Sequence, residues 1–529
     1  MMMNEMAKKA VFFVALLGIC IFHVGVNYQV LVKSHPCYIY DEYIRVASGY
    51  DAFQKIFVAP GVGLYERMKT FLQCDNGQGH PHFFEVIEGF SWKILAGSER
   101  LDPGLVTLFA NTFFLVILLL SIYGTGSILY NRETGLLAAL VTSMLPMVFG
   151  LSRVAMLDYP LMCMCSLSGY LLLSTDNFSS NKFSVLFGMA FGLTELTKEA
   201  AVVFIAPLVI YYFFSSLTIR ETKKVVVNFM MAILVFLITT GIVYFRPENF
   251  HVYGQYISKL NIRNSTSLFY YIDAFHDFVG PWVFILSIPF FLCYWIKFKQ
   301  RDLMLLFWFF LPFVLFSLSV NKATRFILPL APVWALIIAR GVLVNDWPKL
   351  VRRLCVVLFV LVLVVQYGAY NLKYLLPPEG YVLEKGRLSV EKDPYAPAVT
   401  GLVDVFKKEM VPSGVSRMVI PLFDNGCIND SLGLDFALMK LSFWMMCPIE
   451  LDEVDARSSL WKGLPEEILM GDYVLERSED HAMNPGSEIN AIGRGLMAGF
   501  VKYRDHFVKI AEVRVYDNSR VDVYKRIKE

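Results

Sequence analysis

Long, nearly uncharged apolar runs dominate the first 376 of the 529 residues. A helix that crosses a membrane needs about 20 mostly apolar residues. Eleven candidate runs lie at residues 10–32, 103–130, 134–151, 159–175, 184–197, 199–217, 225–244, 280–297, 303–320, 325–343 and 354–371. The whole chain is 56% hydrophobic and 18% charged, whereas soluble domains are about 45–50% apolar and about 25% charged. The sequence therefore predicts a polytopic α-helical membrane protein with about eleven spans, and it excludes disordered, collagen-like and disulfide-rich secreted classes.

Residues 377–529 differ from the rest in composition and charge. They carry 19 Lys and Arg against 25 Asp and Glu, whereas residues 1–376 carry 29 against 21. A polar stretch with several prolines at 377–397 is typical of a linker. The pattern beyond it predicts a helix at 431–446 and strands at 416–423, 472–477, 507–516 and 520–527. We therefore expect a transmembrane domain over 1–376 and a soluble, external α/β domain over 377–529.

The distribution of Lys and Arg between short loops predicts the orientation. With Lys8 and Lys9 on the inside, most basic loop residues also fall inside. The first long loop (33–102), the 245–279 loop and residues 377–529 are then external. No small-residue cleavage site follows the first run, which favours an uncleaved anchor. We expect an integral protein of a prokaryotic inner membrane with its active site on the outer side.

Four cysteines fall outside on this topology, where oxidation can occur. Pairs Cys37–Cys74 and Cys427–Cys447 could form disulfides, but four cysteines allow three pairings. The other cysteines lie in apolar runs, where a free thiol behaves as a small hydrophobic group.

Two charged segments fall in the first external loop. Asp41 and Glu42 open a predicted interfacial helix in the segment YIYDEYIRVASGY. The acids could act chemically, or could simply complement the dipole at the helix N-terminus. In the segment GHPHFFEVIEGFSWKI, His80 and His82 flank a proline. The histidines could contact phosphate or metal, or could only form a turn into a second interfacial helix.

Two further charged segments lie at the external ends of predicted spans. Arg153 and Asp158 share the short hairpin SRVAMLDYPL, where they could pair with each other or serve a substrate. Lys198, in GLTELTKEAAV, could extend to the lipid headgroups or bind a lipid phosphate. Ionisable groups near a membrane are costly and often functional, so carboxylates and cations at one face indicate a reaction on a lipid-linked phosphate.

These segments, followed by NKATRFILPLAP, occur in an order that resembles the membrane glycosyltransferases of the GT-C fold. The similarity covers about residues 8–345 and is strongest to bacterial relatives of the protein O-mannosyltransferases and the lipid A aminoarabinose transferases. Asp41 matches the first-loop catalytic acid of the family, and Glu42 completes its DE pair. Asp158 matches a second external acid of the family, and Arg153 matches the arginine that precedes it. Lys198 matches the lysine of the LTK motif, and Arg325 matches the basic residue of the late segment. His82 stands where many relatives have proline.

The resemblance implies transfer of a sugar from a polyprenyl-phosphate donor to a hydroxyl acceptor on a lipid, glycan or protein. A carboxylate can take the proton from the attacking hydroxyl, and Asp41 is the expected general base. Asp158 is a second catalytic acid. Fixed cations can stabilise the leaving phosphate, and the expected substrate-binding residues are Glu42, His80, Arg153, Lys198 and Arg325. Direct displacement would invert the anomeric centre, whereas a retaining enzyme would need Asp158 as a nucleophile.

A divalent metal held by Asp41, Asp158 and His82 is an alternative source of charge, because hard cations prefer carboxylate oxygens. No other cofactor and no nucleic-acid partner is expected. Two other classes of protein remain open at this point. A transporter would carry midplane charges and often inverted repeats, neither of which is visible in the sequence. A non-catalytic membrane scaffold would present the C-terminal domain and would not act on lipid-linked sugars.

Overall fold

The protein is described here from a computed structural model. The model describes residues 2–34, 40–59, 63–73, 81–95, 103–216, 222–244, 267–299, 302–319, 322–343, 347–375, 380–382, 391–393, 401, 405, 417–422, 449–451, 469, 473–477, 498–514 and 520–527. For residues 40–44, which include Asp41 and Glu42, it describes the backbone alone. The helix predicted at 431–446 and the four external cysteines lie outside the described residues.

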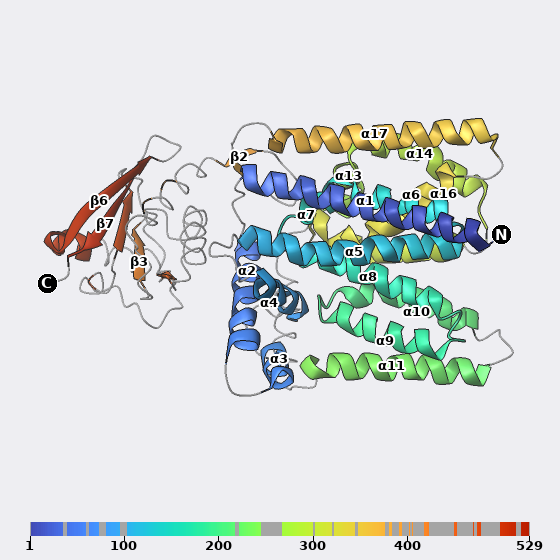
Figure 1. The fold of residues 1–529 in the computed structure, drawn as a ribbon, viewed down its shortest axis with the longest axis horizontal. Helices are drawn as coiled ribbons and strands as arrows, with labels where there is room; N and C mark the ends of the chain where they lie inside the picture. Colours follow the sequence, from blue (N-terminus) through green and yellow to red (C-terminus); the bar gives the residue numbers. More distant parts are fainter. Residues whose placement is uncertain are drawn as a thin grey trace.

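A bundle of helices forms the body of the molecule (Figure 1). Every apolar run of the sequence corresponds to helix in the structure. The bundle helices are α1 (Met2–Ser34), α5 (Pro103–Leu129), α6 (Arg132–Ser143), α7 (Pro146–Leu151), α8 (Asp158–Ser174), α9 (Asn181–Glu195), α10 (Ala201–Ser216), α11 (Thr222–Tyr244), α14 (Pro281–Ile296), α15 (Asp302–Leu318), α16 (Ala331–Val342) and α17 (Lys349–Leu375).

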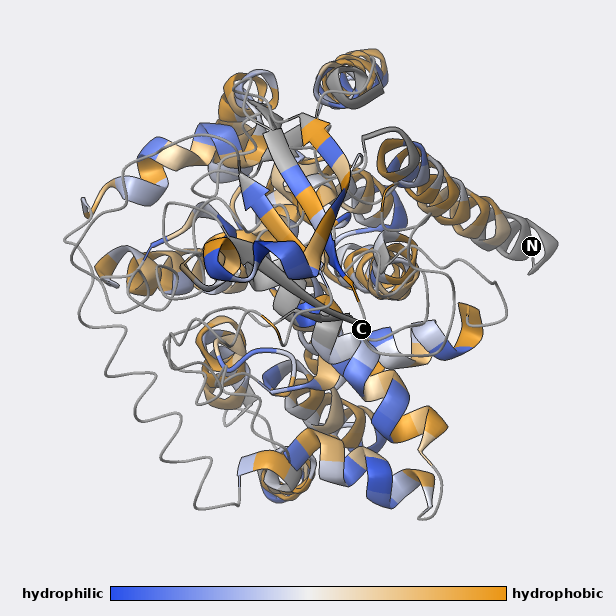
Figure 2. Ribbon diagram, turned by 90° about the vertical axis from the view of Figure 1, so that its left-hand side faces the viewer, coloured by the Kyte–Doolittle hydropathy of each residue, from blue (hydrophilic) through white to orange (hydrophobic). Residues whose placement is uncertain are grey.

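Within the described residues, five helices are long and apolar enough to cross a membrane. A sixth span results if α13 (Tyr270–Val279) and α14 form one broken helix, since they meet at 105°. The others are shorter, so the count of eleven spans stays a prediction. Large exposed apolar side chains lie along α1, α11, α14 and α17, and hydrophobic residues dominate the bundle helices in Figure 2. The fold is that of an integral membrane protein.

Prolines divide two of the predicted runs. The run at 134–151 breaks into α6 and α7 because Leu145, which precedes Pro146, is extended with φ −69° and ψ 137°. A residue before proline is sterically disfavoured in the α conformation. The run at 325–343 begins as a 3-10 helix, η2 (Thr324–Leu330), and continues as α16. The prediction of one continuous helix was wrong for the run at 134–151, whereas Thr324–Val342 is a single candidate span despite its 3-10 start.

Four short elements cross one end of the bundle. They are α2 (Tyr40–Ala52), the π-helix η1 (Phe53–Val58), α3 (Leu64–Gln73) and α4 (Phe83–Leu95). In Figure 1, α2 runs crosswise to α5 at the end nearest the C-terminal strands. We call this the strand-side end of the bundle. Helices α2 and α4 lie where the sequence predicts interfacial helices, whereas α3 and α13 were not predicted.

A small sheet near the C-terminus accounts for the α/β region. Strands β3 (Arg417–Leu422), β5 (Tyr473–Arg477), β6 (Phe507–Arg514) and β7 (Arg520–Arg526) lie where the sequence predicts them. With β4 (Ile449–Leu451), which was not predicted, they form a five-stranded sheet in the order β4-β3-β5-β7-β6. Strand β3 is parallel to β4 and β5, whereas the β5–β7 and β7–β6 pairs are antiparallel.

The predicted linker at 377–397 contains secondary structure. Strands β1 (Gly380–Val382) and β2 (Glu391–Asp393) pair antiparallel within it. A local pair of this kind needs only a short connection, and the polar composition of the segment does not prevent it. The segment thus contains a short antiparallel pair, and its role as a linker stays a prediction.

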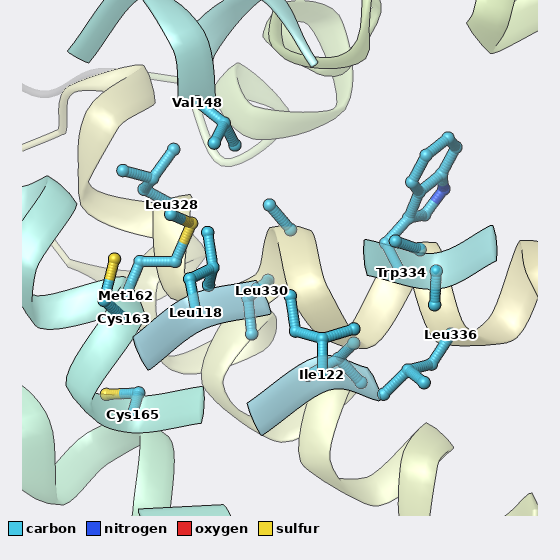
Figure 3. Close-up of a cluster of buried hydrophobic side chains, with 14 of the residues drawn as sticks. Leu118, Ile122, Val148, Met162, Cys163, Cys165, Leu328, Leu330, Trp334 and Leu336 are labelled. Carbon is cyan, nitrogen blue, oxygen red and sulfur yellow. The ribbon is translucent and has the colours of Figure 1, made fainter. Parts of the chain in front are cut away.

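The bundle core lies between α5, α8, η2 and α16 (Figure 3). Side chains from these elements interdigitate and are almost fully buried, among them Leu118, Ile122, Met162, Cys163, Cys165, Leu328, Leu330 and Leu336. Cys163 and Cys165 are free thiols and pack as small hydrophobic groups, as predicted. This core holds the first residue of α8 and the start of η2 in fixed positions, and both contribute to the site below.

Candidate functional site

Asp158 lies between two cations at the strand-side end. Its Oδ1 is 2.7 Å from Lys198 Nζ, and its Oδ2 is 3.5 Å from Arg325 Nε. The carboxylate is buried, with 4% of its side chain exposed, whereas Lys198 and Arg325 keep 14% and 23%. Among these three side chains, two cations face one carboxylate, and both cations are partly exposed. The three residues define the Asp158 cluster.

Each member of the cluster comes from a break between helices. Asp158 is the first residue of α8, where its charge complements the helix dipole. Lys198 lies in the turn between α9 and α10, and this turn is tied to α8 by a 2.8 Å hydrogen bond between Thr194 Oγ1 and Ser168 Oγ. Arg325 is in the first turn of η2. Three segments far apart in the sequence therefore meet at one point.

Phe326 completes the cluster on its apolar side. Its ring centroid is 5.1 Å from Lys198 Nζ and 5.7 Å from the guanidinium carbon of Arg325. Cations within about 6 Å of an aromatic ring are attracted by its electron density. Nearby, Tyr270 of α13 contacts Thr324 of η2, with a hydroxyl-to-hydroxyl distance of 3.3 Å. Neither Phe326 nor Tyr270 was among the predicted site residues. The family resemblance of this segment pointed to Arg325 and not to the aromatic rings near it.

Arg153 belongs to a different network from Asp158. Its Nε donates to Asn27 Oδ1 of α1 at 2.7 Å, and its Nη2 donates to Asn371 Oδ1 of α17. The side chain also lies over the ring of Phe149 at 5.2 Å. The pairing of Arg153 with Asp158 that the sequence left open is not among the ion pairs of the described residues. In this structure Arg153 ties the hairpin before α8 to the first and last bundle helices.

Three buried polar groups lie on α4 or directly before it. His82, just before the helix, packs against Phe71 of α3 with ring centroids 5.3 Å apart and ring planes tilted by 54°. Glu85 pairs with Arg45 of α2 at 2.5 Å. Glu88 accepts a 2.8 Å hydrogen bond from Thr107 of α5. Neither glutamate nor Arg45 was among the predicted site residues.

Several predicted site residues are not tested by the structure. The side chains of Asp41 and Glu42 and the whole of His80 lie outside what the structure describes. The backbone does place Asp41 and Glu42 in the first turn of α2, at the strand-side end. The roles of Asp41, Glu42 and His80 therefore stay predictions.

Two of the three residues of the predicted metal site, Asp158 and His82, have other neighbours in the structure, and the side chain of the third, Asp41, lies outside the described part. Among the side chains of the described residues, no group of three or more His, Cys, Asp or Glu could hold a metal ion. Both oxygens of Asp158 face cations, and the ring of His82 packs against Phe71. We therefore derive no chemical step through a metal.

Comparisons with known proteins were made for both sequence and fold. A family model described as dolichyl-phosphate-mannose-protein mannosyltransferase matches residues 91–245. The structure of ArnT from Cupriavidus metallidurans bound to undecaprenyl phosphate is similar with a TM-score of 0.60 at 12% identity, over 98% of both chains. The archaeal oligosaccharyltransferase AglB from Archaeoglobus fulgidus, in complex with an inhibitory peptide and a dolichol-phosphate, gives 0.53 at 11% identity, over 87% of this chain and 69% of that one. A comparison with curated proteins gave no match.

These similarities establish the architecture of the chain. It is an integral membrane protein with the GT-C fold, as the sequence resemblance predicted. The family match includes α8 and the turn with Lys198, and thus two members of the Asp158 cluster. At 12% identity the structural similarity extends to the fold, so the reaction has to be argued from the site.

Proposed function

We propose that the protein is a membrane glycosyltransferase that moves a sugar from a polyprenyl-phosphate donor to a hydroxyl acceptor. The observation that carries this proposal is the Asp158 cluster: two cations on one buried carboxylate, partly exposed, in a GT-C fold. A lipid phosphate is an anion held at headgroup depth by its tail, because each methylene removed from the bilayer costs about 0.8 kcal/mol. The cluster offers it a positive site at the end of the bundle.

Lys198 and Arg325 are proposed to bind the donor phosphate. Charge-assisted hydrogen bonds to phosphate are short and about twice as strong as neutral ones. Asp158 holds the two side chains together in the absence of donor. Because both cations are partly exposed, a phosphate can approach them without displacing the carboxylate. Asp158 therefore acts here by positioning the cations rather than as a nucleophile.

Asp41 is proposed to be the general base. It would take the proton from the acceptor hydroxyl while the hydroxyl oxygen forms a bond to the anomeric carbon. The bond from that carbon to the phosphate oxygen breaks, and its electron pair stays on the phosphate. The positive charges of Lys198 and Arg325 stabilise this developing charge. A single displacement of this kind inverts the anomeric configuration.

We further propose that the strand-side end faces the outside of the cell. The Lys and Arg bias of the loops supports this orientation. The acceptor would then arrive from the outer solvent, and residues 377–529 would stand beside its path. In a prokaryote the corresponding membrane is the inner membrane.

The proposal can be tested with purified protein in detergent. Lipid-linked sugars extracted from the membranes of the cells that make the protein serve as donor, and their envelope fraction serves as acceptor. Release of free polyprenyl phosphate is measured over time. Wild-type protein should release it in step with sugar incorporation, and Lys198→Ala should lower the rate at least tenfold. A transporter or a scaffold would release none, and this result would overturn the proposal.

A further inference from the structure

We propose that the buried Arg45–Glu85 ion pair is a positioning device that fixes the rotation of α2 and thereby aims Asp41 at the reacting centre. This inference rests on the proposed function, because Asp41 has a role only if the protein transfers sugar. It concerns residues that bind neither donor nor acceptor. Arg45 and Glu85 are therefore positioning residues.

The pair is unusual in its burial. The side chains of Arg45 and Glu85 are 7% and 0% exposed, and their charged atoms are 2.5 Å apart. Removing two charges from water is costly, and a hydrophobic pair of similar size would often be as stable. A buried pair can instead impose one specific arrangement on the elements that carry it. The two elements here are α2 and α4.

The pair lies on a tightly packed contact between these helices. A Cβ atom added at Gly49 would lie 2.7 Å from Glu88 Cβ, and one added at Gly89 would lie 2.9 Å from Ala52 Cβ. Distances under 3.0 Å are essentially never seen for real Cβ atoms. The residues in contact advance together along the two helices, so α2 and α4 run parallel here. Arg45, Gly49 and Ala52 therefore form one face of α2.

Asp41 lies one turn before Arg45 on this helix. Residues four apart project from the same side of an α-helix, so the Arg45–Glu85 contact and the position of Asp41 depend on the same rotation. One residue of the helix corresponds to 100° about its axis, given 3.6 residues per turn. A rotation even smaller than this would change the direction in which position 41 of α2 projects, and the proposed general base occupies that position.

Helix α4 connects this face of α2 to the Asp158 cluster. The backbone N–H of Phe83 donates to the carbonyl oxygen of Leu196 at 3.1 Å, two residues before Lys198. Further along α4, Glu88 accepts from Thr107 of α5. Helix α4 is thus fixed to the turn that carries Lys198. The ion pair completes a chain of contacts between the general base and the cation that binds the phosphate.

The test compares turnover with donor affinity in the assay described above. In Glu85→Gln, kcat should fall about 10-fold to 10²-fold, because misplacement by about 1 Å has effects of that size, while the KM for extracted lipid-linked sugar changes less than twofold. Loss of Lys198 should instead raise KM. Asp51→Asn is the matched control: it removes a carboxylate from α2 whose 2.8 Å ion pair is with Lys55 of the adjoining η1 and not with α4, and it should leave both constants unchanged.

A second variant covers the case in which Glu85→Gln does not fold. Arg45→Met combined with Glu85→Met removes both buried charges and keeps the volume, so the protein should retain its thermal unfolding midpoint. Its kcat should still fall at least tenfold, since the close packing at Gly49 and Gly89 remains but no ion pair then fixes the exact rotation of α2. Normal kcat in this folded double variant, with an active wild type, would overturn the inference alone. A wild type that transfers no sugar would overturn the proposed function, and the positioning role with it.

Discussion

Two aspartates begin helices at opposite ends of the bundle, and their surroundings differ. Asp158 begins α8 and faces Lys198 and Arg325. Asp302 begins α15 and accepts from the hydroxyl of Tyr130 and, at 2.7 Å, from the backbone N–H of Lys299. Their positions can be compared along α5.

The two ends are far apart along that helix. Asn111 of α5 donates to the carbonyl oxygen of Val154, in the hairpin before α8, at 3.0 Å. Tyr130 directly follows the same helix. Nineteen residues at 1.5 Å each separate them, which is roughly 28 Å and close to the thickness of a bilayer core.

The difference lies in charge and in access. Asp302 is fully buried, and both of its carboxylate oxygens accept hydrogen bonds from neutral donors. Arg340 contacts the ring of Tyr130 at 5.1 Å and extends this closed cluster. Around Asp158, by contrast, two cations contact one carboxylate and are partly exposed. We therefore assign a structural role to the end with Asp302, and the proposed function places anion binding at the end with Asp158.

The largest expected effect comes from Asp41→Asn at the strand-side end. Loss of a general base typically slows a reaction about 10²-fold to 10⁴-fold. We expect turnover of extracted lipid-linked sugars to fall by that factor, with undecaprenyl phosphate still bound. Turnover near the wild-type rate in folded protein would remove Asp41 from this role.

The next effect is expected for Lys198→Ala and Arg325→Ala. A hydrogen bond to a charged group contributes about 1.5–3 kcal/mol, which corresponds to roughly 10-fold to 10²-fold in an equilibrium constant. Each variant should weaken binding or turnover of the donor by about that factor. If Lys198 only extends to the lipid headgroups, its replacement will change thermal stability but neither kinetic constant.

Asp302→Asn should affect stability and not activity. The amide presents a donor group where the carboxylate accepts from Tyr130 and Lys299, so one buried donor loses its acceptor. We expect a loss of about 1–3 kcal/mol of unfolding free energy, measured by thermal denaturation in detergent. The folded variant should bind undecaprenyl phosphate as the wild type does; weaker binding would contradict the assignment of a purely structural role to this end.

Arg153→Lys should have the smallest effect. A lysine keeps the positive charge but cannot reach both Asn27 and Asn371 in the way that the guanidinium does. The lysine ammonium can keep one of the two charge-assisted hydrogen bonds, so we expect a net cost of about 1 kcal/mol. A small drop in the unfolding midpoint with unchanged donor affinity is expected. A tenfold loss of affinity would instead return Arg153 to the binding site that the sequence suggested.

The sequence predicted the architecture well and the site in part. Long apolar runs are local features, so every predicted span has its helix, and four strands fall where alternation indicated them. Lys198, Asp158 and Arg325 were found through segments that resemble a known family. The sequence could not show that Arg153 and Asp158 belong to different networks. Arg153 has its partners on α1 and α17, and Asp158 has one of its partners on η2, all more than a hundred residues away in sequence. The Arg45–Glu85 pair was missed because it joins two different helices, 40 residues apart in sequence.

The central claim is that the Asp158 cluster binds a lipid phosphate, and the most direct test compares undecaprenyl phosphate with undecaprenol, which has the same tail and no phosphate. Binding of each to purified protein in detergent can be measured by native mass spectrometry. Wild-type protein and Asp302→Asn should prefer the phosphate at least tenfold, and the double variant Lys198→Ala, Arg325→Ala should show no preference. Equal binding of the two lipids by the wild type, or a preference that survives in the double variant, would contradict the account.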